Sequence, residues 1–134
     1  MTRREPKQMQ VDTSKHPASP EALNRRLPPN EIKRLCAEIA REFHPDKIVL
    51  FGSHAYGKPR LGSDVDLLVV MPFEGSPFRQ AAAILGHVVQ TLGVLPLDLL
   101  VRTGQQVQER IQMGDSFMRE IIERGRVMYE ADHT

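Results

Sequence analysis

The sequence predicts an α/β fold, a small mixed β-sheet with helices packed on it. Apolar segments of strand length recur at residues 47–51, 64–70 and 95–101, and amphipathic segments with helical spacing lie before, between and after them. The 134 residues, 40% of them hydrophobic, are enough to build one core. We therefore expect one domain with the order helix, strand, strand, helix, strand, helix, helix and a short final strand.

The first two helices carry start and stop signals. The first is expected to follow Asn30 as its N-cap and to stop before Pro45, because apolar residues recur between them at helical spacing. Ser76-Pro77 predicts an N-cap and a first-turn proline, and Gly93 is expected to end this second helix. The buried face of the second helix is predicted to consist of Phe78, Ala81, Leu85, Val88 and Leu92.

Two further helices and a strand are predicted in the C-terminal third. Thr103 and Gln106 have the spacing of a capping box, for a helix that ends near Met113. Asp115 is expected to cap another helix that runs to Gly125. Residues 127–129 then predict a short final strand.

The formal net charge of +1 hides an asymmetry along the chain. Residues 1–30 hold six Lys or Arg residues against three acids, whereas the remainder holds twelve against fourteen. With five prolines and few large apolar residues, residues 1–30 are expected to form a disordered basic tail, and residues 31–130 the domain. The balance of charge in the domain argues against a nucleic-acid surface there. Binding of the tail to RNA or to an acidic partner is the alternative to a plain linker.

The remaining composition is typical of an intracellular protein. The one cysteine, Cys36, excludes an intramolecular disulfide framework and is expected to pack on the apolar side of the first helix. The N-terminus is polar, and no apolar run approaches about 18 residues, so neither a signal peptide nor a membrane span is visible. We therefore expect a cytoplasmic location.

Two carboxylates alternate along the second predicted strand. Asp64 and Asp66 are two residues apart, and side chains at this spacing point to the same face of a strand. Unpaired carboxylates held together repel each other unless a cation satisfies both or they lie at a wet strand end. Mg²⁺ is a hard, oxygen-seeking cation that carboxylates commonly share with substrate phosphates. The pair therefore predicts a magnesium site.

A turn suited to phosphate lies immediately upstream. The strand at residues 47–51 runs into Gly52 and Ser53, and ten residues lie between Ser53 and Asp64. Glycine lets a phosphate approach the backbone, and the serine hydroxyl and the free amides of a short helix expected at residues 53–55 can donate hydrogen bonds to it. An ordinary strand-ending turn is the alternative for these two residues taken alone.

A third acid lies in the next apolar segment. Asp98 is the only Asp, Glu, Lys or Arg residue between Gln80 and Arg102. A lone carboxylate inside an apolar strand is costly without a partner, which favours a functional role. Asp98 would complete a second metal site and help to deprotonate a nucleophile.

These motifs together resemble a known family. The Gly52-Ser53 turn, the Asp64-x-Asp66 strand and the later Asp98 are similar to those of the nucleotidyltransferase superfamily that includes DNA polymerase β, and most of all to its minimal bacterial members, the MNT domains. The resemblance covers about residues 31–130 and includes the C-terminal segment at residues 117–129. It implies the polymerase β-like nucleotidyltransferase fold.

The resemblance implies an activity and a partner. It implies a magnesium-dependent enzyme with two Mg²⁺ ions held by Asp64, Asp66 and Asp98, which transfers AMP from ATP to a hydroxyl acceptor, with Gly52 and Ser53 orienting the phosphates. Minimal members are typically paired with a helical HEPN protein, often as antitoxins, and some AMPylate a tyrosine on it. We therefore expect ATP and a HEPN protein as partners.

Some positions depart from the family pattern. Many relatives have arginine where this chain has His54 and Tyr56, and Lys58 and Arg60 are the candidates to compensate. The five histidines have no metal-ligand spacing and are expected to be non-ligands, with His54 placed for nucleotide contact by position alone: they are His16, His44, His54, His87 and His133.

Two other classes of function stay open. The chain could be a non-catalytic antitoxin that neutralises a toxin by contact. It could also be a small-molecule adenylyltransferase, a homo-oligomer whose acceptor site lies across subunits.

Overall fold

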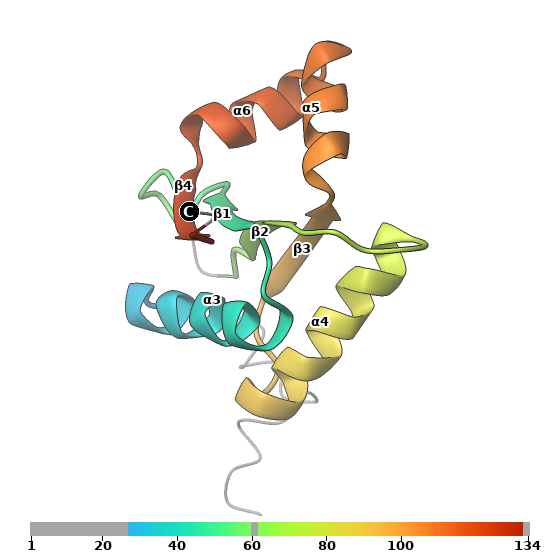
Figure 1. Ribbon diagram of the computed structural model, residues 1–134. Helices are drawn as coiled ribbons and strands as arrows, with labels where there is room; N and C mark the ends of the chain where they lie inside the picture. The colour runs from blue at the N-terminus through green and yellow to red at the C-terminus, as the bar shows by residue number, and fades with distance from the viewer. Residues whose placement is uncertain (1–26, 60–61, 133–134) are drawn as a thin grey trace, which may run out of the picture.

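The computed structural model describes residues 27–59 and 62–132, so the expected tail lies outside it up to residue 26. The described chain forms, in order, α3 (Pro29–Phe43), β1 (Lys47–Phe51), β2 (Val65–Val70), α4 (Pro77–Leu92), β3 (Leu97–Arg102), α5 (Gly104–Gln112), α6 (Ser116–Arg124) and β4 (Arg126–Glu130) (Figure 1). This is the predicted order of elements. No described helix is long and apolar enough to cross a membrane.

The four strands form one mixed sheet in the order β3-β2-β1-β4. Strand β1 is antiparallel to both of its neighbours, β2 and β4. Strands β2 and β3 are parallel. Parallel neighbours need a crossover connection, which α4 provides. The mixed α/β architecture predicted from the sequence is confirmed.

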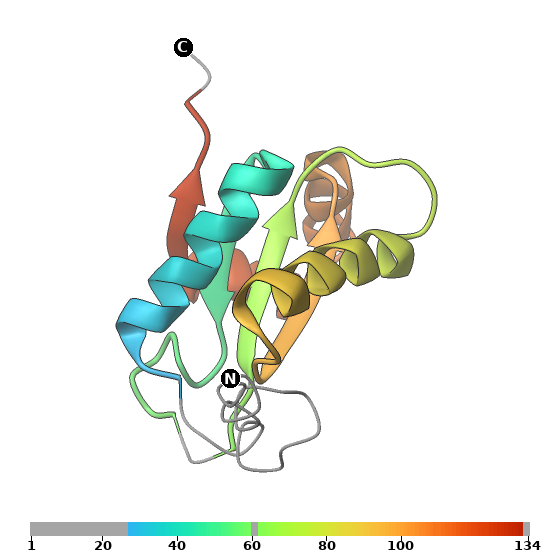
Figure 2. The same ribbon diagram turned by 90° about the horizontal axis from the view of Figure 1, so that it is seen from below.

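Helices cover both faces of the sheet. Figures 1 and 2 show α3 and α4 together on one side, with α5 and α6 on the other. Successive strand side chains point to opposite faces, so Leu67 packs in the α3 and α4 core whereas Leu68 packs against α5 and α6. The smaller core consists of Val49, Leu68, Val70, Val107, Met118 and Ile121.

Helix α3 begins earlier than the sequence predicted. Pro28 is its N-cap and Pro29 its first residue, so the prediction of Asn30 as N-cap was wrong. Proline suits the first helical position because its fixed φ fits a helix and its missing N–H would be unpaired there. Leu27, which the sequence analysis placed in the tail, is only 1% exposed and belongs to the core under α3.

Helix α4 has the predicted caps but a different buried face. The Ser76 hydroxyl accepts a hydrogen bond from the Phe78 amide, and Gly93 is the C-cap. Phe78, however, is 83% exposed, and Ile84 is fully buried in its place. Figure 2 shows why, because the first turn of α4 extends beyond the edge of the sheet that its later turns cover. Phe78 is the second residue of α4 and so belongs to this first turn.

The C-terminal elements follow their predicted caps. Thr103 and Gln106 form a complete capping box at the start of α5. The Asp115 carboxylate accepts a hydrogen bond from the Met118 amide, and Gly125 ends α6. The final strand is present as β4 and is somewhat longer than predicted.

Candidate functional site

The register of β2 and β3 brings two of the candidate acids side by side. Asp66 and Asp98 are paired residues in these parallel strands. By alternation both lie on the face of the sheet that α5 and α6 share, in line with Leu68 and Leu100. Asp64 immediately precedes β2 and is exposed, as is Asp98. Asp98 therefore lies at a wet position near the start of its strand, whereas Asp66 is only partly exposed.

The Gly52 turn meets Asp66 directly. Gly52 follows the last residue of β1, Phe51, whose partner on β2 is Asp66. The Asp66 carboxylate occupies the space that a Cβ atom on Gly52 would need, and Gly52 has a φ of +76°, a left-handed value that favours glycine. Both the backbone conformation and the contact with Asp66 therefore favour glycine at position 52. The Gly52 turn and Asp66 therefore lie in contact at the same end of β1 and β2.

The segment after Gly52 is a tight turn. The Gly52 carbonyl accepts hydrogen bonds from the amides of Ala55 (3.0 Å) and Tyr56 (3.2 Å), and the Ser53 carbonyl accepts one from Lys58. The short helix expected at residues 53–55 is not formed, because Gly57, with a φ of +75°, turns the chain away. The Ser53 and His54 amides have no backbone acceptor among the described residues, which leaves them free to bind an anion.

The charge of the site is strongly unbalanced. Burial raises the pKa of Asp66 to about 6, and repulsion from Asp98 and Asp64 adds to this, while His54 acts in the opposite direction. Within the described chain, none of the three aspartates forms an ion pair with Lys or Arg. Clustered carboxylates with hard oxygen donors and no protein cation fit Mg²⁺ well.

His54 lies inside the structure. Its side chain is buried, and its Nε2 lies 3.3 Å from the Ser63 carbonyl oxygen. Ser63 directly precedes Asp64, so the imidazole links the Gly52 turn to the segment that leads into β2. This placement favours a supporting role for His54 in the site. Arg60, the other residue considered for compensation, lies outside the described residues.

A match to a protein family identifies the domain that carries this site. The nucleotidyltransferase domain family matches residues 32–128, nearly all of the described chain. The protein belongs to the nucleotidyltransferase domain family. The matched segment contains the Gly52 turn and all three candidate aspartates.

Some solved structures are similar to this nucleotidyltransferase domain at low sequence identity. A protein from Sulfolobus solfataricus, provisionally assigned as a nucleotidyltransferase, is 19% identical over 78% of this chain and 81% of that one, with a TM-score of 0.50. A toxin–antitoxin structure with AMP-PNP is 16% identical over 75% of this chain and 74% of that one, with a TM-score of 0.47. The toxin–antitoxin MntA-HepT is 14% identical over 76% and 73%, with a TM-score of 0.41. A comparison with curated proteins found no match.

One face of α6 lies against the Gly52 turn of the nucleotidyltransferase domain. The sequence did not predict this contact. Phe117 makes an edge-to-face contact with Phe51, with ring centroids 5.8 Å apart. The Tyr56 hydroxyl donates to Glu120 Oε2 at 3.3 Å, and the Arg124 Cζ lies 4.7 Å from the centre of the Tyr56 ring. Residues 117, 120 and 124 have the spacing of one helix face, which was the available signal. That spacing alone does not show which surface the face contacts.

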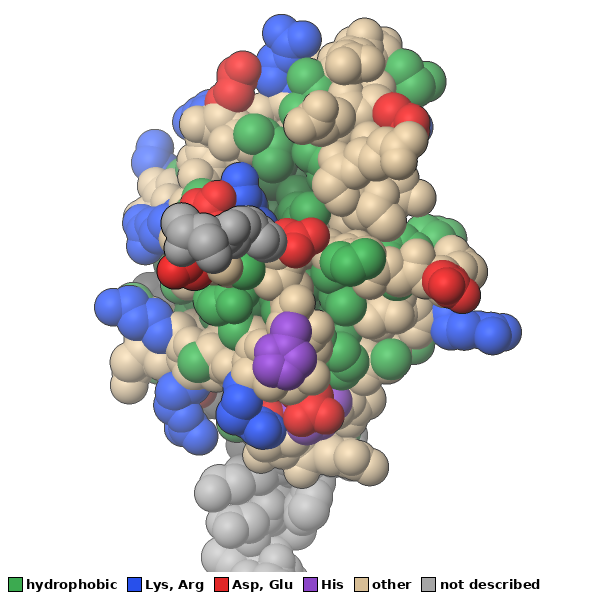
Figure 3. Space-filling model, in the orientation of Figure 1, with side chains coloured by type: hydrophobic (Ala, Val, Ile, Leu, Met, Phe, Trp, Pro, Cys, Tyr) green, Lys and Arg blue, Asp and Glu red, His purple; other side chains and the backbone are tan. Residues whose placement is uncertain are grey.

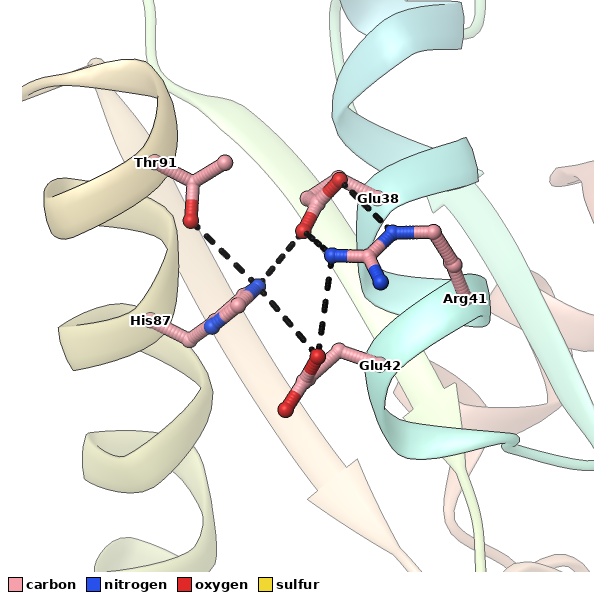
Figure 4. Close-up of polar contacts among 5 residues, drawn as sticks. All are labelled: Glu38, Arg41, Glu42, His87 and Thr91. Atoms are coloured by element: carbon pink, nitrogen blue, oxygen red, sulfur yellow. Dashed lines mark hydrogen bonds and ion pairs between the residues drawn. The ribbon is translucent and has the colours of Figure 1, made fainter.

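A second polar cluster joins α3 to α4 (Figure 4). His87 Nε2 lies 2.6 Å from Glu38 Oε2 and 3.9 Å from Glu42 Oε1. One ligand atom from each of the three residues lies within 4.8 Å of the others, a spacing that the three aspartates do not reach in the described chain. Arg41, however, already pairs with both glutamates. The guanidinium supplies the positive charge, so we interpret this cluster as an interhelix link.

The nucleotidyltransferase domain also has a cavity of about 630 Å³ beside α5. It lies at the Lys47 and Val70 ends of β1 and β2, whereas Asp66 is at the other end of this strand pair. Figure 3 shows hydrophobic side chains in a hollow on this face, below α5 and α6. The cavity lining includes Lys47, Val70, Val107, Gln108, Ile111 and Ile122.

Proposed function

We propose that this domain transfers AMP from ATP to a hydroxyl acceptor, with release of pyrophosphate. The observation that carries the proposal is the contact between the two motifs. Asp66 lies against Gly52 on one side and is paired with Asp98 on the other. This contact holds carboxylates that could bind metal ions next to a turn whose amides could bind phosphate, at one end of the strands. Nucleotidyl transfer needs both.

Asp64, Asp66 and Asp98 would hold two Mg²⁺ ions in this reaction. The raised pKa of Asp66 comes from burial and from the two neighbouring carboxylates, and a cation bound among them would relieve that repulsion. When bound, Mg²⁺ supplies charge neutralisation of the triphosphate and of the developing pyrophosphate. The exposure of Asp64 and Asp98 leaves their remaining oxygens accessible to such ions.

The chain's own residues bind the nucleotide and move the proton. The free amides of Ser53 and His54, with the Ser53 hydroxyl, would donate hydrogen bonds to the phosphates. Asp98 would accept the proton of the acceptor hydroxyl. The acceptor oxygen forms a bond to the α-phosphorus, the bond from that phosphorus to the bridging oxygen breaks, and pyrophosphate leaves with the electron pair.

We further propose that a partner protein supplies the acceptor. The motif resemblance to MNT domains supports a tyrosine of a HEPN protein as the acceptor and an antitoxin role for this chain. The proposal also places the reaction in the cytoplasm, where ATP is abundant.

Transfer of label from ATP tests the function. The protein is incubated with α-³²P-ATP, Mg²⁺ and a lysate of the native host, beside a variant with Asp64→Ala and Asp66→Ala. We expect a labelled protein band that the double variant lacks. Label on a small metabolite instead would favour the small-molecule adenylyltransferase. The absence of label from every fraction, with a toxin still neutralised by the double variant, would favour a non-catalytic antitoxin.

Native purification tests the partner separately. We expect the chain, expressed from its own locus, to elute with a helical protein of similar abundance, and mass spectrometry of that protein to find a tyrosine heavier by one AMP. Elution of the chain alone would contradict the partner proposal without affecting the transfer chemistry.

A further inference from the structure

We propose that Arg124 on α6 binds the triphosphate of the nucleotide held at the Gly52 turn. This inference rests on the proposed function and assigns one more residue to the same site. It follows from the charge that the site needs and from the way α6 meets the turn.

Among the described residues, no Lys or Arg side chain forms an ion pair with the three carboxylates of the site. A triphosphate adds several negative charges, and even two divalent ions shared with three aspartates leave oxygens that need donors. In the described chain, Lys58 belongs to the Gly52 turn, and Arg124 contacts Tyr56 of the same turn. A guanidinium offers five N–H donors in a planar fork that fits phosphate oxygens.

The turn itself holds Arg124 in place. Tyr56 belongs to the turn, since its amide donates to the Gly52 carbonyl at 3.2 Å. The Arg124 guanidinium lies over the face of the Tyr56 ring, at 4.7 Å from its centre. This stacking leaves the edge of the guanidinium, where its N–H groups point, open for an anion. Arg124 is thus anchored on the same turn that offers free amides to phosphate.

Glu120 fixes the same arrangement from the helix side. Its Oε2 accepts from the Tyr56 hydroxyl at 3.3 Å and lies 3.6 Å from Arg124 Nη1. The Arg124 side chain is nevertheless 64% exposed, so the single contact with Glu120 leaves most of its donors in solvent. Burial raises the pKa of Tyr56, and the nearby Glu120 carboxylate raises it further. The phenol therefore stays a hydrogen-bond donor at neutral pH. Tyr56 and Glu120 are therefore positioning residues for Arg124.

A structural latch is the competing explanation for the same contacts. Arg124 is in the last turn of α6, where a cation also stabilises the helix dipole. If that were its only role, removing the guanidinium would loosen the turn and α6 and would affect all nucleotides alike. A phosphate ligand would instead distinguish a triphosphate from a monophosphate.

Equilibrium binding of two nucleotides separates these explanations. Calorimetric titration with AMP-PNP and with AMP, both in Mg²⁺, is carried out on the wild type and on Arg124→Ala, Arg124→Lys and Arg119→Ala. Arg119 is an exposed arginine on the same helix and serves as the matched control. We expect Arg124→Ala to weaken AMP-PNP binding about 10- to 100-fold, the range of one or two charge-assisted hydrogen bonds, and AMP binding less than about 3-fold. Arg124→Lys should recover part of the loss.

Two results of these titrations would overturn the assignment of Arg124. Equal losses for AMP-PNP and AMP would show a latch, and binding unchanged in Arg124→Ala would show that the guanidinium does not touch the phosphates. A Tyr56→Phe variant keeps the ring but loses the bond to Glu120, and we expect it to change AMP-PNP affinity less than Arg124→Ala does. Failure of the wild type to bind AMP-PNP would overturn both this inference and the proposed function. Normal binding with no AMP transfer would overturn the proposed function alone.

Discussion

The Asp66 carboxylate fills the space beside Gly52 that any other residue would need for its side chain. This contact ties the phosphate turn to the candidate metal ligands. A Gly52→Ala substitution would push Asp66 out of place and would also strain a backbone with a φ of +76°. We expect AMP transfer to fall at least about 100-fold and the free energy of unfolding to fall by about 1–3 kcal/mol. Labelled transfer and chemical denaturation measure the two effects.

Gly57 provides the matched control for this substitution. Its φ of +75° is nearly the same, but no atom lies within 4 Å of the position that a Cβ would occupy. Gly57→Ala should therefore cost a similar amount of stability, about 1 kcal/mol or more, and leave most of the activity. If both variants lost activity equally, backbone strain rather than the contact with Asp66 would explain the loss.

Asp98 should be needed for the chemistry and hardly at all for folding. It is exposed and paired in register with Asp66 across β2 and β3. We expect Asp98→Asn to lower the transfer rate by about 10²–10⁴-fold, as loss of a metal ligand and proton acceptor would. Its melting temperature should change little, because an exposed side chain is altered. Glu74→Gln, in the exposed loop before α4, is the control, and an Asp98→Asn protein as active as that control would contradict the assigned role.

Asp66 should lower the stability of the metal-free protein at neutral pH. Burial and the neighbouring carboxylates raise its folded-state pKa from 3.8 to about 6. Because folding raises this pKa, Asp66 contributes its full stabilisation below about pH 4. That contribution is lost as the pH rises through about 6. In EDTA at pH 7.5, Asp66→Asn should therefore be more stable than the wild type by on the order of 1 kcal/mol, since partial exposure screens the effect. The difference should vanish at pH 4, and a wild type that stays the more stable protein at pH 7.5 would contradict this account.

Magnesium should make the wild type more stable than Asp66→Asn at neutral pH. A cation that binds only the folded state stabilises it in proportion to its concentration above the dissociation constant. We expect millimolar Mg²⁺ with AMP-PNP to raise the melting temperature of the wild type by several degrees. The same addition should leave Asp66→Asn nearly unchanged, and an equal rise in both proteins would place the magnesium elsewhere.

The link between α3 and α4 should make stability fall in acid. Hydrogen bonds from Arg41 and His87 lower the pKa of Glu38 from 4.5 to about 2. Because this pKa is lowered on folding, the stabilisation is complete above pH 4.5 and is lost as the pH falls toward 2. Glu38→Gln should be less stable than the wild type at pH 7, and the gap should close between pH 4.5 and 2. Glu42→Gln, whose ion pairs are longer at 3.6 and 3.9 Å, is the control and should show a smaller gap.

Features set by neighbouring residues were predictable from the sequence. The capping box of Thr103 and Gln106 and the Asp115 cap depend only on the local chain, and both are present. The face shared by Asp66 and Asp98 was predictable in part, because alternation fixes which side of a strand a residue faces. Their pairing in register depends on how α4 returns the chain, which no local pattern shows.

Features that depend on distant surfaces were missed. Phe78 fits the predicted apolar stripe of α4, but the sequence does not show which part of that helix packs on the core, and Phe78 is exposed. The bond from Tyr56 to Glu120 joins residues 64 positions apart, so only the packing of α6 on the turn reveals it. The contact of Asp66 with Gly52 likewise follows from β1 and β2 lying side by side.

The fate of each phosphate in ATP tests the central claim most directly. The purified protein and its acceptor are incubated in parallel with α-³²P-ATP and γ-³²P-ATP, and the products are separated into acceptor and pyrophosphate. We predict that the α label appears on the acceptor and the γ label only in pyrophosphate, and that Asp66→Asn loses both signals. Transfer of the γ label to the acceptor, or α label transferred equally well by Asp66→Asn, would contradict nucleotidyl transfer at this site.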